Sequence, residues 1–119
     1  MLLTLQDDGV LRIYGSAAEA ARDIEALDAE ETFRMVFDDA GQRYAIRWIR
    51  PNDRGLFMVG NGEYALVPDG TVDVDALLTL ILETTLVEPE RLKPWLADLA
   101  SRLTSRFSGP ASPAAERPS

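Results

Sequence analysis

The chain has 119 residues and a formal net charge of −8, from 20 acidic and 12 basic side chains, and it contains neither cysteine nor histidine. These absences exclude thiol nucleophiles, Ser-His-Asp triads, disulfide frameworks and zinc sites built from cysteine and histidine. The length suits one domain. The low isoelectric point, about 4.4, argues against nucleic acid as a direct ligand, because phosphate binding requires a basic surface.

The first elements are expected to be a hairpin and a helix. Two apolar-rich runs, residues 2–6 and 10–14, are separated by a short Asp-Asp-Gly segment, which is a strong hairpin signal. Ser16 and Glu19 then have the spacing of a capping box, in which the serine hydroxyl caps the helix and the glutamate reaches back to the Ser16 amide. We expect this helix to run to about Leu27, with an alanine-rich face against a sheet.

Four strand signals follow the helix. The apolar residues of the first two alternate with other side chains, and turn-forming residues separate consecutive strands. Asn61-Gly62, between the last two, is the commonest pair for a two-residue hairpin turn. Together they predict a four-strand antiparallel meander that ends before Pro68-Asp69-Gly70. Its expected strands are residues 33–37, 44–49, 55–60 and 63–67.

Two further helices complete the predicted domain. Asp73 is a suitable N-cap for a helix over about 74–85, whose wide apolar arc favours burial between layers or contact with a second chain. Pro89 suits the first turn of another helix that extends to about residue 106. Pro94 either divides this last helix or kinks it.

The element order ββαββββαα predicts an α+β fold, in which an antiparallel sheet, made of the N-terminal hairpin and the four-strand meander, is packed by three helices on one face. We expect one domain over residues 1–107. Residues 108–119, rich in proline, serine and alanine, are expected to be disordered. The start of the chain lacks the basic region of a signal peptide, and its apolar runs are too short to cross a bilayer. The expected location is therefore the cytoplasm, without membrane contact.

Acidic residues are concentrated in the first helix and just after it. Residues 1–32 hold eight acids and two bases, whereas residues 33–68 hold four acids and five arginines. One interpretation is a solvated face that keeps the protein soluble. The other is a docking surface that steers a basic protein partner. The residues of this candidate partner-binding surface are Glu19, Asp23, Glu25, Asp28, Glu30 and Glu31.

The arginine-bearing strands have two interpretations as well. Arg47 and its neighbours either cover the open face of the sheet with their aliphatic stems or form an anion pocket. Tyr44, Trp48 and Tyr64 either fill the core or form a stacking platform. The paired acids of the chain all stand at turns or helix starts, where structure alone explains them. We therefore expect no enzymatic activity, no metal site and no cofactor.

One segment carries a family resemblance. Residues 19–30 have the sequence EAARDIEALDAE, and residues 37–43 have the sequence FDDAGQR. This arrangement resembles small acidic bacterial proteins of the immunity type, which accompany polymorphic or contact-delivered toxins and block them by binding. The similarity extends over about residues 10–50. It implies a class of function and assigns no binding residue.

The sequence thus supports two leading functional hypotheses of different classes, besides a small catalytic or ligand-binding domain that uses the sheet surface of Tyr44, Arg47 and Trp48. The first is a non-enzymatic immunity protein that binds and blocks a cognate toxin through the acidic surface. The second is a structural or regulatory module that forms a homodimer through the apolar helices within residues 74–107, because their apolar arc is wider than one core contact requires.

Overall fold

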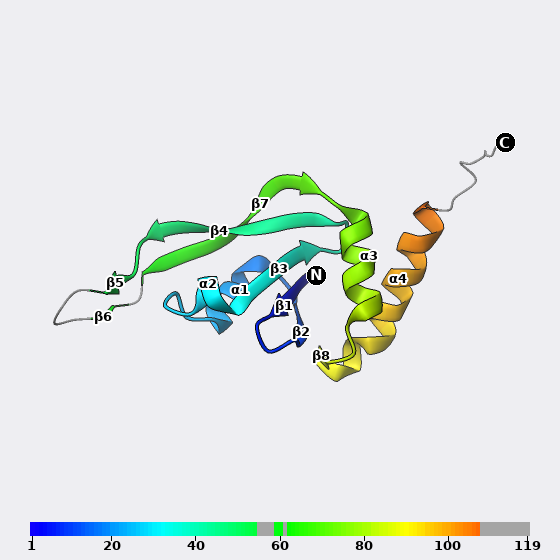
Figure 1. Ribbon diagram of the computed structural model, residues 1–119, viewed down its shortest axis with the longest axis horizontal. Coiled ribbons are helices and arrows are strands. Elements are labelled where there is room, and N and C mark those ends of the chain that lie inside the picture. Colours follow the sequence, from blue (N-terminus) through cyan, green and yellow to red (C-terminus); the bar gives the residue numbers. More distant parts are fainter. Residues whose placement is uncertain (55–58, 61, 108–119) are drawn as a thin grey trace.

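The computed structural model describes residues 1–54, 59–60 and 62–107, and it has the predicted α+β fold. Its sheet has the strand order β7-β4-β3-β1-β2-β8, and helices lie on both faces (Figure 1). The strands of this sheet are β1 (Leu2–Gln6), β2 (Leu11–Tyr14), β3 (Phe33–Asp38), β4 (Gln42–Arg50), β7 (Glu63–Val72) and β8 (Val87–Glu88). A separate pair consists of β5 (Asp53–Arg54) and β6 (Val59–Gly60). The helices are α1 (Ala17–Asp23), α2 (Ala29–Thr32), α3 (Val74–Glu83), the 3-10 turn η1 (Glu90–Leu92) and α4 (Lys93–Phe107).

The predicted N-terminal hairpin forms as β1 and β2 and provides central strands of the sheet. Gly9 adopts a φ of 80°, and the Asp8 carboxylate accepts a hydrogen bond from the Val10 amide at 3.1 Å. The free edge of β1 then pairs with β3 in antiparallel register, from Leu2 opposite Asp38 to Leu5 opposite Met35. The hairpin is therefore a local structure that also organises the rest of the sheet.

One face of the hairpin belongs to the larger hydrophobic core. The side chains of Leu3, Leu11 and Phe37 are fully buried there, and they pack against α3 and α4. Burying one such side chain contributes about 2 kcal/mol to the free energy of unfolding. The helical residues of this core are Leu77, Leu80, Ile81, Leu96, Leu99, Ala100 and Leu103.

The opposite face of the sheet carries a second, smaller core with α1. Leu2, Val36 and Leu66 are buried there together with Ala20 of α1. Leu2 and Leu3 are neighbours in sequence but lie in different cores, because side chains alternate along a strand. The expectation that all helices cover one face is therefore wrong, since the sheet offers apolar side chains on both faces.

The first helix is shorter than predicted. Ser16 caps α1 as expected, accepting from the Glu19 amide at 3.2 Å, but Glu19 itself bonds to the Gly15 amide, one residue before the expected Ser16 amide. The helix ends at Asp23 instead of Leu27, with Ile24 in an extended conformation. The separate short helix α2 follows it.

The predicted meander is correct in its first pairing, because β3 and β4 are antiparallel neighbours, and it differs in the next. On its other edge β4 pairs with β7, and among the described residues neither β5 nor β6 pairs with β4. Of the strand expected over 55–60, the structure describes only β6, which pairs with β5 just before the expected range. Residues 55–58, and Asn61 of the expected turn, lie outside the described part of the chain. β7 also continues through Pro68 to Val72, where the sequence predicted the end of the sheet.

The C-terminal elements agree with the prediction in most respects. Asp73 caps α3 and accepts from the Ala76 amide at 2.9 Å. The predicted last helix is divided into η1 and α4 between Leu92 and Lys93, and Pro94 lies in the first turn of α4. The strand β8 was not predicted; it pairs in parallel with β2 and makes the sheet mixed.

Residues 108–119, for which disorder was predicted, lie outside the described part of the chain. Among the described residues, no helix is long and apolar enough to span a membrane.

Gly41 provides a test of this packing. Its φ is +88°, and a Cβ atom there would lie 2.9 Å from Val74 Cγ2, at the start of α3. We expect Gly41→Ala to lower the free energy of unfolding by about 2–4 kcal/mol, from the left-handed conformation and the steric clash together. Chemical denaturation measures this loss.

Gly70→Ala is the matched control. Gly70 has the same φ of +88°, but beyond its own chain neighbours no atom lies within 4 Å of the position that a Cβ would take. This substitution should cost only the conformational part, about 1–2 kcal/mol. Equal losses in the two variants would contradict the proposed contact between the β3–β4 turn and α3.

Candidate functional site

The acidic segment predicted as a docking surface lies on α1, on α2 and on the chain between them. All six predicted carboxylate residues have exposed side chains. The segment is fixed to the β4–β7 end of the sheet by two long-range hydrogen bonds. The Tyr64 hydroxyl donates to the Ile24 carbonyl at 2.7 Å, and the Asn52 side chain donates to the Ala26 carbonyl at 2.9 Å. The exit from α1 is therefore held by tertiary contacts and presents its carboxylates from a defined backbone.

The structure divides the six predicted residues into two groups. Glu19 bonds to the Gly15 amide, and Asp23 accepts a hydrogen bond of 2.6 Å from the Tyr14 hydroxyl. These two carboxylates have structural partners. The remaining four form no hydrogen bond or ion pair through their side chains with any described residue; they are Glu25, Asp28, Glu30 and Glu31. We call these four the acidic surface.

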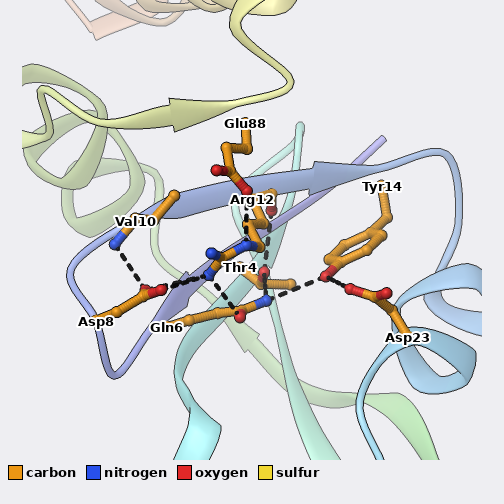
Figure 2. Close-up of polar contacts among 8 residues, drawn as sticks. All are labelled: Thr4, Gln6, Asp8, Val10, Arg12, Tyr14, Asp23 and Glu88. Atoms are coloured by element: carbon orange, nitrogen blue, oxygen red, sulfur yellow. Dashed lines mark hydrogen bonds and ion pairs between the residues drawn. The ribbon is translucent and has the colours of Figure 1, made fainter.

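A polar network lies beside Asp23 on the same face of the sheet (Figure 2). Thr4 and Gln6 are buried, with exposed fractions of 0% and 2%. The side-chain Nε2 of Gln6 donates to Thr4 Oγ1 at 3.0 Å and to the Tyr14 hydroxyl oxygen at 3.2 Å. The Gln6 carbonyl oxygen accepts from the Arg12 guanidinium at 2.9 Å. Each functional atom of the Gln6 amide thus has a partner, which compensates for its removal from water.

Arg12 joins this buried network to the surface. Its guanidinium forms ion pairs with Asp8 at 3.0 Å and with Glu88 at 2.9 Å, so it links the hairpin to β8. Hydrogen bonds from the Val10 amide and from Arg12 lower the pKa of the Asp8 carboxyl. Beside the network is an open cavity of about 360 Å³, bordered by Arg12, Tyr14, Asp23 and Glu88 among others.

Both tyrosines near Asp23 remain protonated far above neutral pH. Burial and the hydrogen bond to Asp23 raise the pKa of Tyr14 from 10.0 to about 12. Burial and the charge of Asp23 raise the pKa of Tyr64 from 10.0 to about 12. These hydroxyls therefore act as hydrogen-bond donors that hold Asp23 and the end of α1.

The sequence analysis did not identify this network, although one pattern pointed to it. Alternate residues of the hairpin are polar on one side, and Thr4 lies directly opposite Arg12 in the observed register. A strand period of two, applied to both faces, places these side chains together. Their connection to Asp23 and Glu88 depends on elements distant in sequence.

The structure brings together the aromatic residues of the stacking platform suggested for the strands, but not the arginine of the suggested anion pocket. Tyr44 and Trp48 lie on the α1 side of β4, and the rings of Trp48 and Tyr64 are 5.8 Å apart. Strand alternation places Arg47 on the opposite face, so this arginine does not join the aromatic residues. A cavity of about 340 Å³ lies between β3 and β4, with Arg34 and Arg43 in its lining.

Comparisons with known proteins add no assignment: no family model, curated protein or solved structure matches the chain. Within the described residues, no group of three or more acidic side chains has the geometry to hold a metal ion.

The tyrosine contacts predict how stability changes at high pH. Because the pKa of Tyr14 and of Tyr64 is raised to about 12 in the folded protein, their protonated forms stabilise the fold below pH 10.0. This stabilisation should be lost as the pH rises from 10.0 towards 12. Tyrosinate absorbance, followed together with thermal unfolding over this range, tests the expectation.

Asp23→Asn should lower the pKa of both tyrosines, because it removes the negative charge that contributes to both shifts. Tyrosinate absorbance should therefore appear at lower pH than in the wild-type protein. Asp28→Asn is the control, since the Asp28 side chain forms no cap hydrogen bond. The interpretation fails if both variants leave the tyrosine titration unchanged.

Proposed function

We propose that this chain is a non-enzymatic binding protein that acts in the cytoplasm and blocks a basic protein partner through the acidic surface. In line with the family resemblance, we propose that the partner is a bacterial toxin. The observation that carries the proposal is the group of four exposed carboxylates without partners among the described residues, between Glu25 and Glu31.

These carboxylates differ from the acids that stabilise the fold. Asp8, Asp23 and Glu88 each have a hydrogen-bonded partner, so their charge is used within the molecule. Four uncompensated charges in seven consecutive residues repel one another, which is unfavourable unless a cation approaches. Such a field accelerates the encounter with a basic surface, by up to a few orders of magnitude at low salt.

The backbone beneath the acidic surface supports a binding role as well. Ile24 and Ala26, just before Asp28, accept hydrogen bonds from side chains of the β4–β7 region. A segment that is already ordered loses less conformational entropy when it binds than a free loop does. Charge and preorganisation together favour a docking surface over a merely solvated face.

The test combines charge reversal with a defined partner, the product of the gene adjacent to the one that encodes this chain. We expect the triple variant Glu25→Lys/Asp28→Lys/Glu31→Lys to slow association about tenfold or more at low salt, because electrostatic steering is reversed. Pull-down, surface plasmon resonance and survival of cells that express the adjacent gene measure the effect.

The matched control is Asp39→Lys/Glu83→Lys/Glu90→Lys. It makes the same change in net charge at three exposed acids that form no ion pair with any described residue, all outside the acidic surface. The control should retain most of the association rate and the protection. Equal effects of the two triple variants, or the absence of any complex and of any protection by the wild-type chain, would overturn the proposal.

A second candidate function is self-association through the apolar helices. Two large hydrophobic side chains near the end of α3 face solvent, Leu82 with 70% and Leu86 with 57% of their surface exposed. An open cavity of about 500 Å³ between α3 and α4 is lined mainly by apolar residues, Leu82 and Leu96 among them. A second copy would remove this surface from water.

Light scattering with sedimentation velocity tests the second candidate. If the helices form a homodimer, the wild-type chain should be dimeric at micromolar concentration, and Leu82→Ser/Leu86→Ser should be monomeric, since both changes reduce apolar surface. The same variant should keep its far-ultraviolet circular dichroism. A wild-type chain that remains monomeric at such concentrations excludes this function.

A further inference from the structure

β3 and β4 are consecutive strands, but they separate soon after the turn that joins them. In the part of the chain that the structure describes, their ladder consists of the single pair Phe37 and Arg43. Figure 1 shows the two strands converging beside α3 and moving apart towards their other ends. Residues of both strands, Met35 and Ile46 among them, line the cavity of about 340 Å³ noted above.

An irregularity in β3 accompanies the separation. On its other edge, β3 pairs with β1, where Leu5 lies opposite Met35 and Gln6 lies opposite Phe33. Arg34 is thus an extra residue in the ladder, and such a bulge bends a strand and increases its twist. β4 in turn follows its partner β7, opposite which it is paired from Gln42 to Arg50.

The two edges that face the gap carry main-chain groups outside any described ladder. The β1 side of β3 and the β7 side of β4 are occupied, so residues 34–36 and 44–48 turn their remaining edges towards each other across the cavity. Unpaired N–H and C=O groups along a strand are a template for another strand.

The outer edges of the sheet are poorer templates. β7 contains the exposed Pro68, which has no N–H to donate, and β8 is only two residues long. Proline and short length are the usual means by which an edge strand avoids further pairing. Neither protects the gap, because residues 33–36 and 43–48 contain no proline. The accessible edges are therefore inside the sheet.

The side chains around the gap indicate the chemistry of an occupant. Arg34 and Arg43 line the cavity, and Arg47, outside its lining, lies by strand alternation on the same face of β4 as Arg43, which stacks over Phe37. None of these arginines pairs with a carboxylate among the described residues. Tyr44 and Ile46 lie on the other face, against the smaller core. A segment between β3 and β4 would meet these arginines on one face and apolar surface on the other, and Glu30 is the one carboxylate among the described residues that line the cavity.

We propose that the gap between β3 and β4 receives an extended segment of another protein, in which acidic and apolar residues alternate. Its main chain pairs with both strands. Its carboxylates face Arg43 and Arg47, and its apolar side chains extend the core at Tyr44 and Ile46. This proposal concerns a surface of opposite charge to the acidic surface and does not depend on the proposed function.

The first experiment measures peptide binding by fluorescence anisotropy. The probe is a labelled, end-capped hexapeptide of alternating glutamate and valine, and the comparison peptide alternates lysine and valine. We expect only the acidic peptide to bind, and Arg47→Glu to weaken its binding about tenfold, because it reverses one charge pair. Arg91→Glu is the control, since Arg91 is exposed on η1 and the charge change is the same.

An N-methylated form of the acidic peptide separates strand pairing from simple charge attraction. N-methylation removes main-chain donors but leaves the charge unchanged, so its binding should be lost if the peptide pairs with the strands. No binding of the acidic peptide at about 1 mM, which corresponds to only about −4 kcal/mol, overturns the proposal. Equal binding of the N-methylated peptide overturns it too.

Hydrogen exchange provides an independent readout that needs no variant. In the free protein, amides within residues 34–36 and 44–48 that point into the gap should exchange faster than those in the ladders on either side. The acidic peptide should selectively slow the exchange of these amides.

Slow exchange of these amides in the free protein at every concentration would mean that β3 and β4 pair with each other. Slow exchange that appears only at high protein concentration would identify a second copy as the occupant. Either result overturns the proposal.

Discussion

The alternation of side chains along β1 is the constraint on which the rest of the structure depends. β1 lies between β2 and β3, and each of its residues must serve one of two faces. Leu3 enters the core with α3 and α4, whereas Leu2 enters the core with α1. A shift of one residue would exchange the two sets and place the Gln6 side chain in the larger apolar core. The register is therefore specified from both sides at once.

The polar residues on the second face of the hairpin follow from the same constraint. Because Thr4 and Gln6 are buried, each needs partners within the protein, and the network around Arg12 supplies them. The network reaches α1 through Asp23 and β8 through Glu88. Asp8, Asp23 and Glu88 belong to this network and stabilise the fold. The carboxylates of the acidic surface lie outside it, and their charge is available to solvent or to a partner.

The two proposed binding surfaces have opposite charge and lie near each other. Glu30 belongs to the acidic surface and also borders the cavity between β3 and β4. The short helix α2 contacts β3, so a ligand at one surface has a physical route to influence the other.

The sequence by itself determined the features that depend on neighbouring residues. The hairpin around Gly9 and the caps of Ser16 and Asp73 need only local hydrogen bonds and backbone conformations, and so their positions were predictable. The exposure of the acids after α1 followed from the same local pattern. Tertiary structure alone decided where α1 ends, because the Ile24 carbonyl bonds to Tyr64, 40 residues away. It also decided the pairing of β4 with β7, the hydrogen bond between Tyr14 and Asp23, and the gap beside β3. Each of these depends on contacts between segments that are distant in sequence, and no local sequence pattern indicates such contacts.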